Sequence, residues 1–198
     1  MIQSNIKNKL PHHFKNYRCF DDDVFIVDYT NQTQTSQIKR SVECFCKIPP
    51  SEINYFSVRN KKKIKVDVII FDNSSFILKK GLYRSQCEAV VFPSLSNTES
   101  WILFCELKYN DTPKRNREHL NKAFKQLYRT RYYYIQNEIF SNSNISYLIA
   151  SLPKQREPFP HFLLPPQILS KLKKKRNIIL DMKNTVEIVN SNSINTRN

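Results

Sequence analysis

The run Trp101–Lys108, WILFCELK, constrains the fold of this chain more than any other segment. Every residue from Trp101 to Cys105 is apolar, without the alternation typical of a strand that has one face in water. Such a run predicts a strand at the centre of a sheet that is covered on both faces. The run ends in Glu106 and Lys108, two charges that packing does not require. These two charges are therefore candidates for a functional role.

The segments around this strand predict a mixed α/β fold. Residues 64–71, 86–92 and 145–152 are rich in β-branched and apolar residues and are predicted to be strands. Between the last two strands, apolar residues recur at three- and four-residue steps from Leu120 to Ile135, which indicates one long amphipathic helix. The order predicts a mixed central sheet in which an antiparallel strand meander is joined, through a long crossover helix, to a further strand.

The length and composition bound the organisation of the chain. We expect residues 1–198 to form a single domain, with its core at 64–152, an N-terminal extension or embellishment at 1–22 and a flexible tail at 190–198. No apolar run is long enough to span a membrane and no charged-then-apolar leader opens the chain, so we expect a cytoplasmic protein without membrane contact. The odd number of cysteines, 5, fits reduced thiols in that compartment.

The charge balance favours a polyanionic partner. The chain has 32 Lys and Arg against 17 Asp and Glu, a net charge of +15. Coding bias is the alternative explanation, because Asn and Ile are also abundant. A single glycine, Gly81, argues against glycine-rich phosphate loops and so against a nucleotide-fuelled enzyme. Basic residues that could contact nucleic acid, or simply be solvated, are Lys122, Lys125, Arg129, Lys173, Lys174 and Lys175.

A group of charged residues could carry chemistry at one edge of the predicted sheet. Side chains two apart on a strand share a face, so Glu106 and Lys108 point the same way. If the strand that carries Glu88 is the antiparallel neighbour, Glu88 lies close to both. Carboxylates and a backbone carbonyl, here that of Leu107, are suitable ligands for Mg²⁺, and a lysine can orient or deprotonate a water. The pattern favours metal-assisted hydrolysis of phosphodiesters.

Glu88, followed by Glu106-Leu107-Lys108, a long helix and a strand, resembles the PD-(D/E)XK superfamily of restriction-endonuclease-like nucleases over residues 64–152. The resemblance implies a restriction-endonuclease-like core and a Mg²⁺- or Mn²⁺-dependent endonuclease that hydrolyses DNA. Glu88, Glu106 and the Leu107 carbonyl would hold the metal, and Lys108 would serve the attacking water. Members of this family act in restriction, phage defence or DNA repair. Single- or double-stranded DNA, and a homodimer, are all compatible with the resemblance.

The sequence departs from the family pattern at two positions. Cys87 stands where Pro is usual and Glu88 where Asp is usual, and the longer Glu would shift a bound metal. Asp67 is an alternative metal ligand, if its strand is the true neighbour of the strand at 101–108. Glu43 and Glu52 are candidates for the acidic residue that the family often carries on an earlier helix.

Further alternatives stay open. Some nuclease branches add a Gln and a Tyr on the following helix, where Gln126 and Tyr132 are loosely placed. Glu106 and Lys108 could instead form a structural salt bridge that needs no metal, with Glu88 also pairing to Lys108. The chain would then be a catalytically inactive nucleic-acid-binding or protein-interaction module on the same fold.

Overall fold

The protein is described by a computed structural model, which covers residues 1–50, 53–72, 75–79, 82–83 and 85–196. The described residues form a central six-stranded mixed sheet with the order β1 (Tyr17–Phe20), β5 (Val66–Ile70), β8 (Ala89–Pro93), β9 (Ile102–Leu107), β10 (Ser146–Ser151) and β11 (Ile178–Met182). β1, β5, β8 and β9 pair antiparallel in turn, and β10 runs parallel to both β9 and β11. The predicted mixed α/β class is confirmed.

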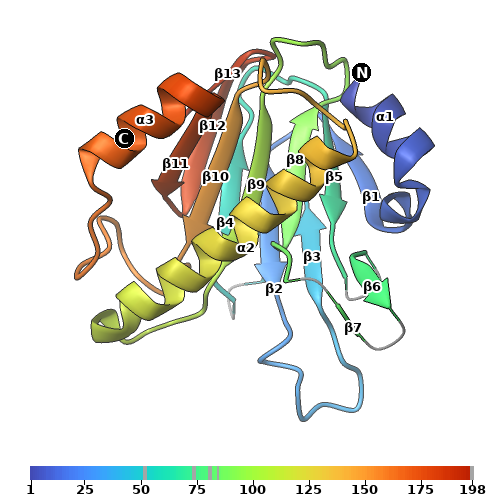
Figure 1. Cartoon of the computed structure of the whole chain (residues 1–198). Coiled ribbons are helices and arrows are strands. Elements are labelled where there is room, and N and C mark those ends of the chain that lie inside the picture. The colour runs from blue at the N-terminus through green and yellow to red at the C-terminus, as the bar shows by residue number, and fades with distance from the viewer. Residues whose placement is uncertain (51–52, 73–74, 80–81, 84, 197–198) are drawn as a thin grey trace.

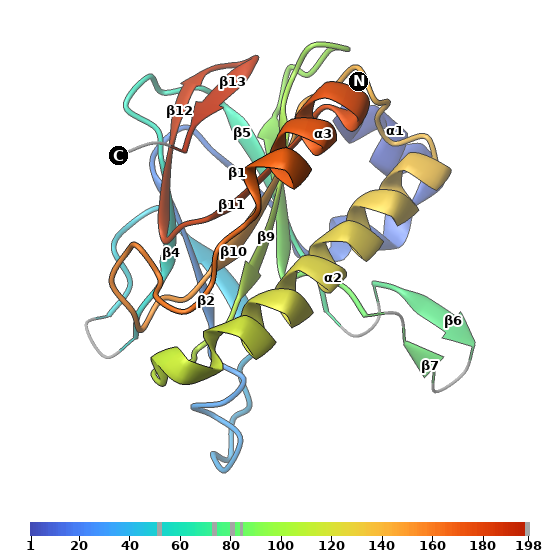
Figure 2. The same cartoon turned by 60° about the vertical axis from the view of Figure 1, so that its left-hand side comes forward.

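Helices cover one face of this sheet (Figures 1 and 2). α2 (Asn116–Gln136) leads from the end of β9 towards the start of β10 and crosses the sheet, with α1 (Ile2–Lys9) and α3 (Pro166–Arg176) on either side of it. Apolar side chains of the helices and of this sheet face form the helix-side core, which includes Ile6, Phe104 and Leu127. The regular helix begins at Asn116 because Pro113–Arg115 forms a 3₁₀ turn.

A second sheet, which the sequence analysis does not predict, covers the other face (Figure 2). The described part of the chain builds it from five strands in the order β13 (Ser193–Asn195), β12 (Thr185–Asn190), β4 (Phe56–Arg59), β2 (Val24–Asp28) and β3 (Val42–Phe45). Its apolar side chains and those of the central sheet form the sheet-side core, which includes Ile26, Phe56 and Leu103. With both faces covered, every residue of β9 is buried, as its apolar run predicts.

Two segments expected at the periphery are built into the fold. Residues 1–22, predicted to be an extension, contribute α1, whose Ile2 and Ile6 are fully buried, and β1, which pairs with β5. Residues 190–198, predicted to be a flexible tail, include β13, which pairs with β12 and buries Ile194. The few apolar residues of these polar segments are spaced to meet the core, and that tertiary packing fixes them.

Two segments project from the body of the molecule (Figures 1 and 2). One is the connection between β2 and β3. The other is the hairpin of β6 (Ile77–Lys79) and β7 (Leu82–Tyr83), inserted between β5 and β8. Among the described residues, no helix has both the length and the apolar character that a membrane crossing needs.

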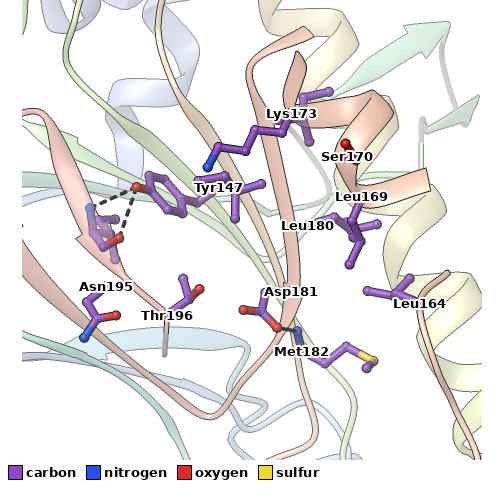
Figure 3. Close-up of a pocket in the computed structure, with 13 residues that line it drawn as sticks. Tyr147, Leu164, Leu169, Ser170, Lys173, Leu180, Asp181, Met182, Asn195 and Thr196 are labelled. Carbon is purple, nitrogen blue, oxygen red and sulfur yellow. Dashed lines mark hydrogen bonds between the residues drawn. The ribbon is translucent and has the colours of Figure 1, made fainter. Parts of the chain in front are cut away.

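Tyr147 of β10 fastens the C-terminal strand to the central sheet. Its hydroxyl donates to the carbonyl oxygen of Ile194 at 3.1 Å and accepts from the amide of Ile194 at 3.0 Å (Figure 3). Tyr147 also borders a cavity of about 530 Å³ between α3, β11 and residues 194–196. One side chain therefore satisfies both backbone groups of a residue in an edge strand.

We expect Tyr147→Phe to lower the free energy of unfolding by about 1–3 kcal/mol, because it leaves the buried amide and carbonyl of Ile194 without their partner. Chemical denaturation measures the loss, and hydrogen exchange should show faster opening at 193–195. The matched control is Tyr132→Phe, since Tyr132 is 56% exposed. Equal stability of the two variants would contradict the anchoring role.

Candidate active site

The pairing of β8 with β9 brings Glu88 and Glu106 together. Ala89 pairs with Cys105, and the amide of Glu88 donates to the Cys105 carbonyl at 3.0 Å, so Glu88 lies beside the Cys105–Glu106 end of β9. The charge of Glu106 raises the pKa of Glu88, and Gln126 of α2 acts on Glu106, so the two carboxylates lie close together and Glu106 lies near α2. Lys108 lies two residues further and points the same way. The structure thus brings together the three residues that the sequence singles out.

Glu106 is a buried carboxylate that is only partly satisfied. Its side chain has no exposed surface, and its Oε1 accepts a hydrogen bond from the Lys108 ammonium, whose side chain is 16% exposed. Its Oε2 is buried and has no hydrogen-bond partner among the described residues. An unpaired buried carboxylate oxygen costs free energy. A ligand atom or a cation at this oxygen would therefore stabilise the protein.

Asp28, which the sequence analysis missed, enters the site from the second sheet. It ends β2 and lines the same cavity as Glu88 and Lys108. Its amide donates to the Tyr109 hydroxyl at 3.1 Å, which ties β2 to the segment after β9. Val24–Asp28 is an apolar strand that ends in a carboxylate, which marks Asp28 as unusual but does not indicate that it lies beside the end of β9.

Burial and repulsion set the protonation of the acidic residues. Burial raises the pKa of Glu106 to about 7, although the Lys108 ammonium acts to lower it. Burial, and then the charges of Glu106 and Asp28, raise the pKa of Glu88 well above its usual value. Gln126 of α2 is close enough to Glu106 to lower the pKa of that carboxyl slightly. The cluster therefore favours uptake of a proton or a cation near neutral pH.

The site opens into a cavity of about 780 Å³. One wall is formed by Arg115, at the end of the 3₁₀ turn, and by residues of the N-terminal half of α2: Glu118, His119, Lys122 and Gln126. The opposite wall is the connection after β2, including Thr30, Asn31 and Arg40. Leu107 also lines the cavity, and its side chain packs in the sheet-side core. Acids at the floor and basic residues in the walls suit a phosphate ester held near a cation.

Cys87 has a structural role. Its amide donates to Thr130 Oγ1 of α2 at 2.9 Å. A proline has no amide hydrogen and could not make this bond. The bond joins the segment before β8 to the helix that forms a wall of the cavity.

The alternative acidic ligands lie elsewhere or are undescribed. The Asp67 alternative is wrong, because β8 and not β5 is the neighbour of β9. Asp67 lies opposite Phe92, at the far end of β8, and its Oδ1 accepts from the hydroxyls of Tyr17 and Ser94 at 2.9 and 2.6 Å. Glu43 pairs with Arg40 at 2.7 Å and is not among the residues that line the cavity in the described part of the chain. Glu52 lies outside the described residues.

The other predicted residues divide between the cavity and the surface. Gln126 and Lys122 line the cavity, whereas Tyr132 is exposed near the end of α2. Among the described residues, Lys125 and Arg129 are exposed on α2 without lining the cavity. The α3 residues lie away from it: Lys173 borders the cavity of Figure 3, and Lys174 and Lys175 are exposed.

Comparison with known proteins gives no relative: no protein-family model, curated protein or solved structure matches this chain. Among the described residues, no three His, Cys, Asp or Glu side chains are grouped as a metal-binding set. The carboxyl groups whose charges act on one another at the site are those of Glu88, Glu106 and Asp28.

We expect the stability of the metal-free protein to fall as pH rises from about 4.5 to 7. The pKa of Glu106 is higher in the folded than in the unfolded chain, so the unfolded state loses its proton first and gains relative stability over this window. Glu106→Gln should remove the Glu106 part of this loss while the part due to Glu88 remains, so the difference in unfolding free energy between the two proteins should change by roughly 3 kcal/mol across the window. Denaturant titrations at several pH values measure it.

The matched control is Glu99→Gln, which removes an exposed carboxylate in a turn. Its stability should keep the pH dependence of the wild type. Parallel pH profiles for the wild type and Glu106→Gln would contradict the raised pKa.

Proposed function

We propose that the protein is a metal-dependent nuclease with a restriction-endonuclease-like core, which hydrolyses DNA phosphodiester bonds at this site. The observation that carries the proposal is the close pair Glu88 and Glu106, with Lys108 bonded to Glu106 and with Glu106 Oε2 buried and unpaired in the described part of the chain. The order of β5, β8, β9, α2 and β10 supports the core assignment, because an antiparallel meander leads through one helix to a parallel strand.

The residues at the site fit a divalent cation. Glu88 and Glu106 repel each other, and Glu106 Oε2 lacks a partner among the described residues. Together with the Leu107 carbonyl they would hold Mg²⁺ or Mn²⁺, and Mg²⁺ commonly needs only one or two carboxylates because it keeps several waters. A bound cation would supply Lewis-acid polarisation of the phosphodiester.

Lys108 has two roles in the proposed reaction. Its ion pair opposes the effect of burial on Glu106 and so favours the charged carboxylate. Its ammonium also lines the cavity, where it can orient the attacking water and offset the charge that develops on the phosphate. Lys108 thus acts both on the Glu106 carboxylate and on the attacking water and the phosphate.

The basic walls support a polyanionic substrate. Arg40 stands on one wall, and Arg115 and Lys122 stand on the other. The net charge of +15 adds a long-range attraction for nucleic acid. A catalytically inactive nucleic-acid-binding module is the second candidate, since the same basic residues would serve it without any metal.

Lys108→Met should reduce DNA cleavage at least about 100-fold, because it removes a donor aimed at the reacting phosphate. The measurement is nicking of supercoiled plasmid and of single-stranded circular DNA with Mg²⁺ or Mn²⁺. The matched control, Lys62→Met in the turn after β4, should cleave like the wild type. Salt-dependent binding without cleavage in either metal would instead support the inactive module, and cleavage that survives Lys108→Met would refute the role of Lys108.

Mn²⁺ should stabilise the protein at pH 8, because it relieves the repulsion between Glu88 and Glu106. At 100 times its dissociation constant the gain is about 2.7 kcal/mol, seen as a higher melting temperature than in EDTA. Glu88→Gln should lose most of this shift and Glu99→Gln should keep it. An equal shift in both variants would show that Mn²⁺ binds elsewhere.

A further inference from the structure

Buried polar atoms without a hydrogen-bond partner gather around the cavity at the candidate active site. In the described part of the chain, three residues that line it carry such an atom: Gln86 and Gln126 at Oε1 and His119 at Nε2. Folded proteins pair nearly all buried polar atoms, with protein groups or with ordered water. A concentration of unpaired atoms in one cavity indicates that a ligand supplies the missing partners.

The orientation of the two glutamine amides is fixed by their other bonds. Gln126 Nε2 donates to the backbone carbonyl of Gln86 at 2.8 Å, and Gln86 Nε2 donates to the backbone carbonyl of Asp72 at 2.7 Å. A carbonyl oxygen only accepts, so each amide must present its nitrogen to it. Each glutamine therefore keeps its Oε1 as an acceptor for a ligand that carries N–H or O–H groups.

His119 extends this polar surface along α2. It lies seven residues before Gln126, on the same helix face, and both side chains line the cavity. Burial, and then the nearby Arg115 guanidinium, lower the pKa of His119, so its ring is neutral at pH 7. A neutral imidazole can accept or donate a hydrogen bond at Nε2, according to its tautomer.

The size and charge of the cavity indicate the class of ligand. Its volume of about 780 Å³ lies within the range of about 300–1,000 Å³ typical of pockets that enclose a small molecule, and is far larger than a hydrated cation requires. Three basic residues stand in its walls: Arg40, which is ion-paired with Glu43, Arg115, which is ion-paired with Glu118, and Lys122, which has no ion pair among the described residues. A ligand with hydrogen-bond donors at its centre and negative charge at its ends matches this surface. A nucleotide whose base has left the stack has that composition.

We propose that this cavity binds one unpaired nucleotide beside the phosphate to be cleaved, so that the substrate is a single strand or an unpaired stretch of a duplex. The cleavage part rests on the proposed nuclease function, whereas the binding preference does not. Gln86 and Gln126 accept hydrogen bonds from amino or imino groups of the base, which Watson–Crick pairing would otherwise occupy. Arg115 and Lys122 hold the adjoining phosphates.

The test is a binding measurement without catalysis. Fluorescence anisotropy in EDTA compares one labelled oligonucleotide as a single strand and as a blunt duplex. We expect the wild type to bind the single strand about tenfold more tightly or better. Gln126→Leu should weaken single-strand binding about tenfold and leave duplex binding unchanged. Gln136→Leu, on the exposed end of the same helix, should change neither.

A second variant guards against a folding defect. His119→Leu should weaken single-strand binding in the same direction, and a thermal melt should show that the protein stays folded. Equal wild-type affinity for the two forms of DNA, or equal losses for both in Gln126→Leu, would overturn the inference. So would a loss of Mn²⁺ stabilisation in Gln126→Leu with unchanged single-strand binding, because the glutamine would then serve a hydrated cation.

The two proposals can fail separately. Preferential single-strand binding with no cleavage in Mg²⁺ or Mn²⁺ supports the nucleotide site and removes the nuclease function. Cleavage of single strands and duplexes at the same rate, lost in Lys108→Met, supports the nuclease and overturns the nucleotide site.

Discussion

The ion pair between Glu106 and Lys108 at the end of β9 is the interaction on which the candidate site depends. β9 is buried on both faces, so the Glu106 carboxylate lies where water cannot solvate it. Removing a charge from water costs several kcal/mol, and a partner offsets this only in part. The apolar side chains of the same strand, at about 1.5–3 kcal/mol each when fully buried, hold the carboxylate in place. The apolar packing of β9 and the ion pair thus offset the cost of a buried carboxylate that would otherwise destabilise the fold.

Sequence reasoning succeeded where local pattern and short-range connectivity decide the structure. The unbroken apolar run of β9 predicts its central position, and the short connection from β8 makes the two strands neighbours, which puts Glu88 beside the Cys105–Glu106 end of β9. The same reasoning left Asp67 open as a ligand. The strand order decides that point, because β5 carries Asp67 and Glu88 directly precedes β8, but of these two strands only β8 pairs with β9.

Asp28 and the second sheet could not be found in this way. β2 and β9 are far apart in sequence, and nothing in either strand indicates that their ends meet. Their contact depends on β4 and β12, which bring β2 over the sheet-side core. Similarly, Ile2 and Ile6 give α1 a short apolar stripe that is too weak to predict a helix without the groove that receives it. Tertiary packing fixes the position of β2 and the helical conformation of α1, which local sequence preference does not determine.

Several departures from local rules lie around the candidate site, and they share a physical reason. Glu106 Oε2, Gln126 Oε1 and His119 Nε2 are buried polar atoms without partners in the described part of the chain. The protein would be more stable with an apolar residue of similar size at each of these positions. α2 could then pack against the sheet without a cavity. Proteins retain such groups where a function needs them, and the remaining core carries the cost. Cys87 adds a fixed point beside the cavity, because its amide joins the segment before β8 to Thr130 of α2.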